Sequence, residues 1–145
     1  MNESITFDCP LPPGPLRRNR ETAHKGFRAA LVRAYQEQVW CAGHMSGHSL
    51  QLGAAIAPPP FWYESMPWPK ARLTLTWRHH RVGPDADNAL ASCKYLIDVL
   101  KATGPRPLGI FRDDSPDYLE IMPMQIVKIR SKAEEGITVL VERVA

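Results

Sequence analysis

Pro84-Asp85-Ala86-Asp87-Asn88 opens the stretch around which this sequence is organised, and Arg112-Asp113-Asp114-Ser115 closes it. Between the two lies a helix-like run to Lys101 and a break containing Gly and Pro. Residues 85–120 carry seven acidic and four basic side chains, a net charge of −3, so the remainder of the chain carries +6. Concentrated negative charge in a basic protein costs self-repulsion unless a cation binds there while the basic surface holds a polyanion. This charge distribution suggests a metal-dependent site acting on nucleic acid.

A helix with one charged and one apolar face is expected between these two acidic segments. At about 100° per residue, the two stripes fall on opposite sides of the helix. The charged stripe comprises Asp87, Ala91, Lys94, Asp98 and Lys101, and the apolar stripe comprises Ala89, Cys93, Leu96, Ile97 and Leu100. The apolar side is therefore expected to face the core and the charged side to carry the chemistry.

The acidic residues admit two interpretations. An Asp at the start of a helix can cap it by accepting hydrogen bonds from the first free amides. Capping explains Asp85 or Asp87 but not both, and it does not explain Asp113 and Asp114. Acidic clusters are also often only solvated surface. From these residues alone, surface charge and a metal site are about equally supported.

The same residues resemble a known family. The pattern Asp85-x-Asp87-Asn88, then Lys94-x-x-x-Asp98-x-Leu100, a Gly-containing turn and Asp113-Asp114-Ser115 looks like the RusA family of Holliday-junction resolvases, which are common in phages and prophages. The likeness covers most of the chain. It extends upstream to the N-terminal strand, to its exit Leu11-Pro12-Pro13 and to Asn19.

Within the RusA family, three aspartates bind Mg²⁺ and a lysine assists cleavage. The resemblance implies that Asp85, Asp87 and Asp114 are the catalytic metal ligands here and that Lys94 is the lysine. Lys94 stands a few residues further from the first aspartate than in the shortest family members. The implied activity is that of a crossover junction endodeoxyribonuclease, which hydrolyses phosphodiester bonds of four-way (Holliday) junctions in DNA recombination and repair.

The resemblance further implies Mg²⁺ as cofactor, with Mn²⁺ able to substitute, and a symmetric homodimer that makes paired cuts. Mg²⁺ binds through one or two carboxylates, waters and substrate phosphates, so a few aspartates suit it better than zinc. The ion would polarise the phosphoryl group, activate a water and stabilise charge on the leaving 3′ oxygen. Lys94 would neutralise charge on the phosphate or orient the water. A two-fold symmetric junction matches an isologous dimer.

Two other functions stay open at this point. The chain could be a nuclease of the same fold that cuts other branched DNA, such as forks and flaps, or simple duplex. It could instead be a catalytically silent DNA-binding module in which the aspartates are structural.

The rest of the sequence bounds the class of protein. Its 145 residues, 44% of them hydrophobic, suffice for one domain with a sizeable core, so residues 1–145 are expected to form a single RusA-like domain. Three widely spaced cysteines without a signal peptide favour a reduced, cytoplasmic location. No apolar run approaches the length of a membrane span, so no membrane association is expected.

The apolar patterns predict the order strand, helix, strand, helix, strand, strand. The strands are expected at 4–8, 72–80, 118–130 and 137–143, the last two joined as a hairpin. Helical spacing predicts a helix from about residue 22 to 41 that stops at Gly43. The fold class is α/β in the broad sense (α+β), with two helices on one mixed four-stranded sheet.

Basic residues on either side of the predicted site are candidate DNA contacts. Arginine and lysine bind phosphates and supply most nucleic-acid affinity without reading sequence. The candidates are Arg17, Arg18, Asn19 and Arg20 after the proline-rich arm, and Arg78 and Arg81 after the second strand. A solvated loop is an equal alternative for the first group.

Residues 42–69 are the least interpretable segment. Its aromatic residues could stack on unpaired bases, but packing against the core or a partner subunit is favoured. They are Phe61, Trp62, Tyr63 and Trp68. Cys41, His44 and His48 have a zinc-like spacing but supply only three ligands, so a flexible loop with incidental histidines is preferred.

Overall fold

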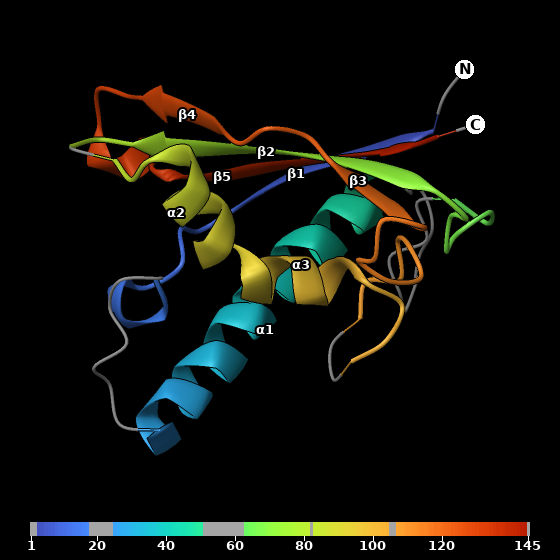
Figure 1. Cartoon of the computed structure of the whole chain (residues 1–145), viewed down its shortest axis with the longest axis horizontal. Coiled ribbons are helices and arrows are strands. Elements are labelled where there is room, and N and C mark those ends of the chain that lie inside the picture. The colour runs from blue at the N-terminus through green and yellow to red at the C-terminus, as the bar shows by residue number, and fades with distance from the viewer. Residues whose placement is uncertain (1–2, 18–24, 51–62, 82, 105–106, 145) are drawn as a thin grey trace.

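Strand β2 (Ala71–His79) lies inside the sheet and decides its order. On one edge β2 pairs antiparallel with β5 (Gly136–Arg143), which pairs antiparallel with β1 (Ser4–Cys9). On its other edge β2 pairs parallel first with β3 (Leu119–Ile121) and then with β4 (Gln125–Lys128). The computed structural model in Figure 1 describes residues 3–17, 25–50, 63–81, 83–104 and 107–144, and these form one mixed five-stranded sheet.

The α-helices of the described chain cover one face of this sheet (Figure 1). α1 (Lys25–Leu50) connects β1 to β2, while α2 (Ala86–Ser92) and α3 (Lys94–Leu100) form the crossover from β2 to β3. Parallel neighbours require such a crossover, because the chain must return to the same end of the sheet. Short 3₁₀ helices η1 (Gly14–Leu16) and η2 (Lys132–Glu134) complete the fold. The α+β class with a mixed sheet in a single small domain is confirmed.

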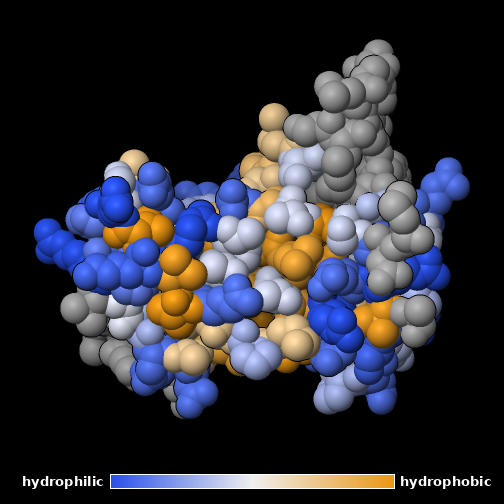
Figure 2. Space-filling view, turned by 90° about the horizontal axis from the view of Figure 1, so that it is seen from above, coloured by the Kyte–Doolittle hydropathy of each residue, from blue (hydrophilic) through white to orange (hydrophobic). Residues whose placement is uncertain are grey.

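The core lies between the sheet and the helices. In β2, Leu73, Leu75 and Trp77 are buried, while the residues between them are only partly buried. This is the alternation that a strand with one covered face requires. The expected apolar stripe is also confirmed, because Ala89, Cys93, Leu96, Ile97 and Leu100 are all buried. Figure 2 looks onto the sheet's other face from above, and hydrophilic and hydrophobic residues are mixed on it.

The predicted hairpin between the last two strands is wrong. β4 and β5 lie on opposite edges of β2, so they do not pair with each other. Because β4 runs parallel to β2, the chain must cross the end of β2 before it can return antiparallel as β5. Residues 129–135, including η2, make that crossing.

The sheet has five strands rather than four because the expected strand at 118–130 is interrupted. Met122 still donates its amide to the carbonyl of Leu73 at 2.9 Å, but Pro123 has no amide proton and cannot continue the ladder. Pairing resumes at Gln125 and continues to Ile129, whose amide donates to His79 at 2.8 Å. Pro123 therefore splits one path along β2 into β3 and β4.

The single helix expected after Asp87 is two helices. The hydroxyl of Ser92 donates to the carbonyl of Asn88 at 2.8 Å, which competes with the backbone and bends helices. The Cys93 amide then bonds to Leu90 at 3.0 Å in a tighter turn, and α3 begins at Lys94. The charged stripe is therefore not one continuous line.

Gly43 does not end the first helix, as the sequence predicted. α1 continues to Leu50, so Cys41 and His44 lie on a helix rather than in a loop. A Cβ at position 43 would lie 2.6 Å from Leu108 Cδ1 and 3.5 Å from Phe7 Cζ. The glycine therefore serves close packing of α1 against its neighbours.

Within the described ranges, none of the helices has the length and apolar character needed to cross a membrane.

Candidate functional site

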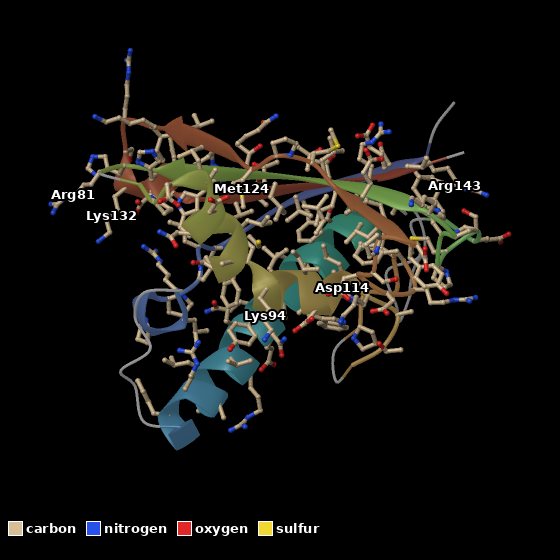
Figure 3. All side chains as sticks on the ribbon, viewed as in Figure 1. Arg81, Lys94, Asp114, Met124, Lys132 and Arg143 are labelled. Atoms are coloured by element: carbon tan, nitrogen blue, oxygen red, sulfur yellow. The ribbon has the colours of Figure 1, made fainter. Side chains whose placement is uncertain are left out.

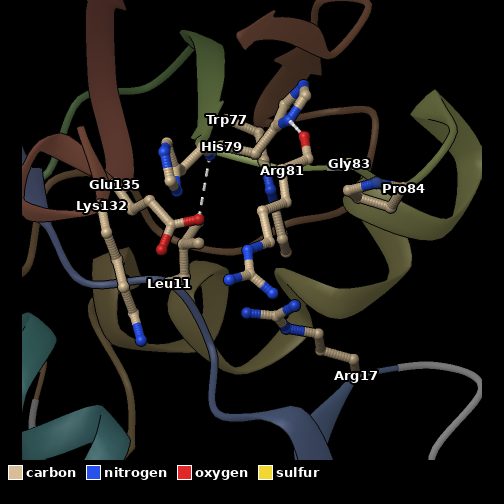
Figure 4. Close-up of a pocket in the computed structure, with 10 residues that line it drawn as sticks. Leu11, Arg17, Trp77, His79, Arg81, Gly83, Pro84, Lys132 and Glu135 are labelled. Carbon is tan, nitrogen blue, oxygen red and sulfur yellow. Dashed lines mark hydrogen bonds between the residues drawn. The ribbon is translucent and has the colours of Figure 1, made fainter. Parts of the chain in front are cut away.

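A pocket of about 380 Å³ lies where β2 ends, directly before the Asp-x-Asp-Asn motif. Three stretches that are far apart in the sequence form its walls (Figure 4). They are the proline-rich arm with Leu11 and Arg17, the end of β2 from Trp77 to Arg81 with the turn Gly83-Pro84 that follows it, and the β4–β5 crossing with Lys132 and Glu135. The predicted motif therefore begins at the edge of a cavity.

Positive charge dominates this pocket. In Figure 4 the guanidinium groups of Arg17 and Arg81 point toward one another across it. With Lys132 and Glu135 counted and the histidines neutral, the described residues of the lining carry two net positive charges. Among the described residues, no hydrogen bond or ion pair holds the side chain of Arg81 or Lys132. Like charges gathered in this way favour an anionic ligand, because an anion offsets their mutual repulsion.

The proline-rich arm and the chain after β2 hold the pocket's shape. Arg17 donates from Nε to the carbonyl of Pro12 at 3.0 Å, and its guanidinium carbon lies 5.4 Å from the centroid of the Trp77 ring. The amide of His80 donates to Glu135 Oε2 at 3.1 Å, drawn as a dashed line in Figure 4. A Cβ at Gly83 would lie 2.6 Å from the His79 ring, so a larger residue there would push this ring aside.

Asp85 and Asp87 lie where α2 begins, directly after Pro84 of the pocket's wall. Asp85 caps the helix: its Oδ1 accepts from the Asn88 amide at 2.9 Å, and its Oδ2 from Asn88 Nδ2 at 3.4 Å. Asp87 is exposed in the first turn of α2 and takes no part in this cap. The capping interpretation therefore holds for Asp85, while Asp87 does not cap and has only the favourable position of an acidic residue in the first turn of a helix.

Asp114 belongs to a different cluster, centred on Lys101 at the end of α3. Lys101 Nζ lies 3.1 Å from Asp98 Oδ1, 3.7 Å from Asp114 Oδ1 and 3.9 Å from Asp113 Oδ1. Figure 3 shows Lys94 and Asp114 along α3, whereas Arg81 and Lys132 lie together at one end of the molecule. The structure thus brings Asp85 and Asp87 together at the start of α2 and pairs Asp114 with a lysine beyond the end of α3.

These residues fit the expected magnesium site only in part. Across the described ranges, no three His, Cys, Asp or Glu side chains are grouped so that they could hold a metal ion. Asp85 and Asp87 offer the one or two carboxylates that Mg²⁺ uses alongside water and substrate phosphates. Asp114 does not join them in this arrangement, because its carboxylate faces the Lys101 ammonium. The three-aspartate site stays a prediction.

The Lys101 cluster gives a prediction about stability. Partial burial alone lowers the pKa of Lys101, but the hydrogen bond to Asp98 and the charges of Asp98, Asp114 and Asp113 raise this pKa above its ordinary value. A raised folded-state pKa stabilises the fold below the unfolded pKa of about 10.4, and the gain is lost as the pH rises through the folded value. We expect Lys101→Met to lower the melting temperature by about 3 °C at pH 7, an effect kept small by solvent screening.

Thermal unfolding of both proteins across a pH series measures this effect. The difference between them should shrink above about pH 10.4, while Lys128→Met, which replaces an exposed lysine of β4, should show no such trend. A difference in melting temperature that stays constant with pH would mean that Lys101 stabilises the fold through packing of its aliphatic stem and not through its charge.

The other predicted DNA contacts have separate positions. Arg17 and Arg81 share the pocket, but Arg78 is engaged by the protein itself: its Nε donates to Glu134 at 3.0 Å and its Nη1 contacts Asp8 Oδ1 at 3.3 Å and the Thr138 hydroxyl. Arg18, Asn19 and Arg20 lie outside the described residues, as do Phe61 and Trp62. Tyr63 and Trp68 pack together, with ring centroids 5.7 Å apart.

Sequence reasoning missed Lys132, Glu135 and Lys101 as parts of these clusters. A hairpin at 131–136 would have placed the first two away from β2, whereas the crossing carries them over its end. The available signal was Pro123, because a proline in a predicted strand argues for an edge position. Lys101 and Asp98 lay on the predicted charged stripe, but nothing local linked them to Asp114.

No protein-family model matches this chain, and no curated protein matches it either. The resemblance to RusA resolvases therefore rests on the motif residues themselves.

None of the three cysteines is among the residues that line the pocket. All three cysteines are free thiols. Burial raises the pKa of Cys9 and of Cys93 to about 12, so both thiols stay protonated near neutral pH. A protonated, buried thiol is a poor nucleophile and a poor metal ligand.

Proposed function

We propose that this chain is a Mg²⁺-dependent, structure-selective DNA endonuclease of the RusA type, which resolves four-way junctions by paired phosphodiester hydrolysis. The observation that carries the proposal is the meeting of Arg17 and Arg81 in a cationic pocket that Pro84, the residue before Asp85, helps to line. A group that binds phosphate thus adjoins a pair of carboxylates. The proposal also rests on the motif resemblance.

The chain's own residues divide the work in this proposal. Arg17, Arg81 and Lys132 bind a phosphate group of the DNA, and such contacts lose affinity as salt rises because bound counterions are released. Asp85 and Asp87 form the acidic pair beside that phosphate. Mg²⁺ is the proposed cofactor, with Mn²⁺ able to substitute. A homodimer acting in the cytoplasm, in recombination and repair, completes the proposal.

A catalytically silent DNA-binding module is the second candidate. It is favoured by one observation, the ion pair at 3.7 Å that holds Asp114 against Lys101. In that case the cationic pocket binds DNA and the aspartates serve only helix capping and ion pairing.

A substrate panel separates these functions. Four-way junction, fork, flap and linear duplex are incubated with the protein in Mg²⁺, in Mn²⁺ and in EDTA at one stated salt concentration. Metal-dependent cutting that is fastest on the junction is expected, with cuts paired across it. Equal cutting of every substrate would support a nuclease without junction selectivity, and binding without cutting would support the silent module.

Lys94 gives a further prediction of this proposal. It is exposed at the first position of α3, with its Nζ 5.8 Å from the centroid of the Tyr95 ring. Lys94→Ala should slow cleavage by about a hundredfold, since removing one cation at a developing phosphate charge costs roughly 3 kcal/mol. Single-turnover cleavage rates measure this, and Mg²⁺ titration should give an unchanged midpoint. A wild-type rate would assign Lys94 to the solvated surface.

A further inference from the structure

The charge and the shape of the pocket beside Asp85 single out one kind of phosphate. Those of its lining residues that the structure describes carry two net positive charges with the histidines neutral. A phosphodiester within a DNA strand carries one negative charge, whereas a terminal phosphomonoester carries about 1.5 to 2 at pH 7. The monoester therefore matches the pocket's charge more closely than an internal diester does.

The residues that line the pocket also suit a terminal phosphate. Stretches from three parts of the chain surround it, and the buried Trp77 ring lines it. The guanidinium groups facing one another in Figure 4 also suit a phosphate with three terminal oxygens, because each can donate two parallel hydrogen bonds.

We propose that this pocket binds the phosphomonoester at the 5′ end of a DNA strand. The choice of the 5′ end rests on the proposed function, because hydrolysis with a 3′ oxygen as leaving group gives one fragment a 3′ hydroxyl and leaves the phosphate on the new 5′ end of the other. The pocket then holds the end of a strand that has been cut, next to the carboxylates of α2.

Glu135 is the one carboxylate among the lining residues that the structure describes, and its position is compatible with this ligand. Its Oε2 accepts the His80 amide at 3.1 Å, so part of its charge is offset by the backbone. Glu135 also ties the β4–β5 crossing to the end of β2 and so keeps Lys132 near Arg81. We assign it a positioning role and expect no contact between it and the phosphate.

The test compares three short oligonucleotides by isothermal titration calorimetry in EDTA: pTpT with a 5′ phosphate, TpTp with a 3′ phosphate, and TpT with neither. We expect pTpT to bind about tenfold or more tightly than the other two. Arg81→Gln and Lys132→Gln should each remove that preference. Lys128→Gln makes the same change of charge at an exposed site outside the pocket and should keep it.

Equal binding of pTpT and TpT would overturn the phosphomonoester assignment, and equal binding of pTpT and TpTp would overturn the choice of the 5′ end. Circular dichroism of each variant confirms that it is folded. The assay uses neither metal nor cleavage, so it is independent of the nuclease proposal. Junction cutting without a pTpT preference would reject the pocket assignment alone, and a pTpT preference without cutting would reject the nuclease alone.

Discussion

Asp87→Asn should abolish Mg²⁺-dependent junction cleavage while leaving junction binding intact or tighter. Asp87 is exposed at the start of α2, three residues after Pro84 of the pocket, and it takes no part in the helix cap. The change keeps the shape of the side chain and removes one negative charge, which would repel a phosphate. We expect cleavage to fall about a thousandfold, which corresponds to roughly 4 kcal/mol of lost transition-state stabilisation.

Asp117→Asn is the matched control, because Asp117 is an exposed aspartate outside the motif. It should cut at the wild-type rate. Single-turnover rates and junction affinity, measured at the same salt concentration, separate catalysis from binding. Undiminished cutting by Asp87→Asn would remove Asp87 from the mechanism, and weaker binding together with slower cutting would show that it acts on affinity instead.

Trp77→Ala should lower the free energy of unfolding by about 4 kcal/mol, the cost typical of emptying a large buried aromatic site. Trp77 is 1% exposed, lies in the central strand β2 and lines the pocket below Arg17. Its loss leaves a cavity between sheet and helices and removes the ring that the Arg17 guanidinium covers. Urea unfolding followed by circular dichroism measures the change as a lower midpoint at constant slope.

Trp77→Phe is the control, because it keeps an aromatic ring in the core and should cost less than the alanine change. Equal losses for the two variants would mean that the indole's fit, rather than its buried area, is what stabilises β2. A loss below about 1 kcal/mol for Trp77→Ala would mean that the neighbouring side chains collapse into the cavity.

The sequence predicted those parts of the fold that depend on neighbours along the chain. The alternation of Leu73, Leu75 and Trp77 marks a strand with one buried face wherever that strand lies in the sheet. Which strand lies beside it is a long-range matter. Residues 131–136 suit a hairpin turn as well as a crossing. Which of the two forms depends on β4 and β5 pairing with opposite edges of β2, and this pairing is not visible in the local sequence.

The candidate site divides in the same way. The start of α2 at Asp85 follows from local capping chemistry and was accessible from the motif. The meeting of Arg17 with Arg81 depends on the path of the proline-rich arm after β1. The pairing of Asp114 with Lys101 depends on the path of the chain after α3. Neither contact has a signature in the spacing of residues, so both needed the folded chain.

The order of strands has a consequence for synthesis of the protein. β5 is made after every other described strand, yet it lies between β1 and β2. Until it leaves the ribosome, β1 has no antiparallel neighbour and one edge of β2 stays unpaired. A nascent chain that already contains α1, α2 and α3 therefore still exposes unpaired strand edges. The sheet can be completed only after Gly136–Arg143 has left the ribosome.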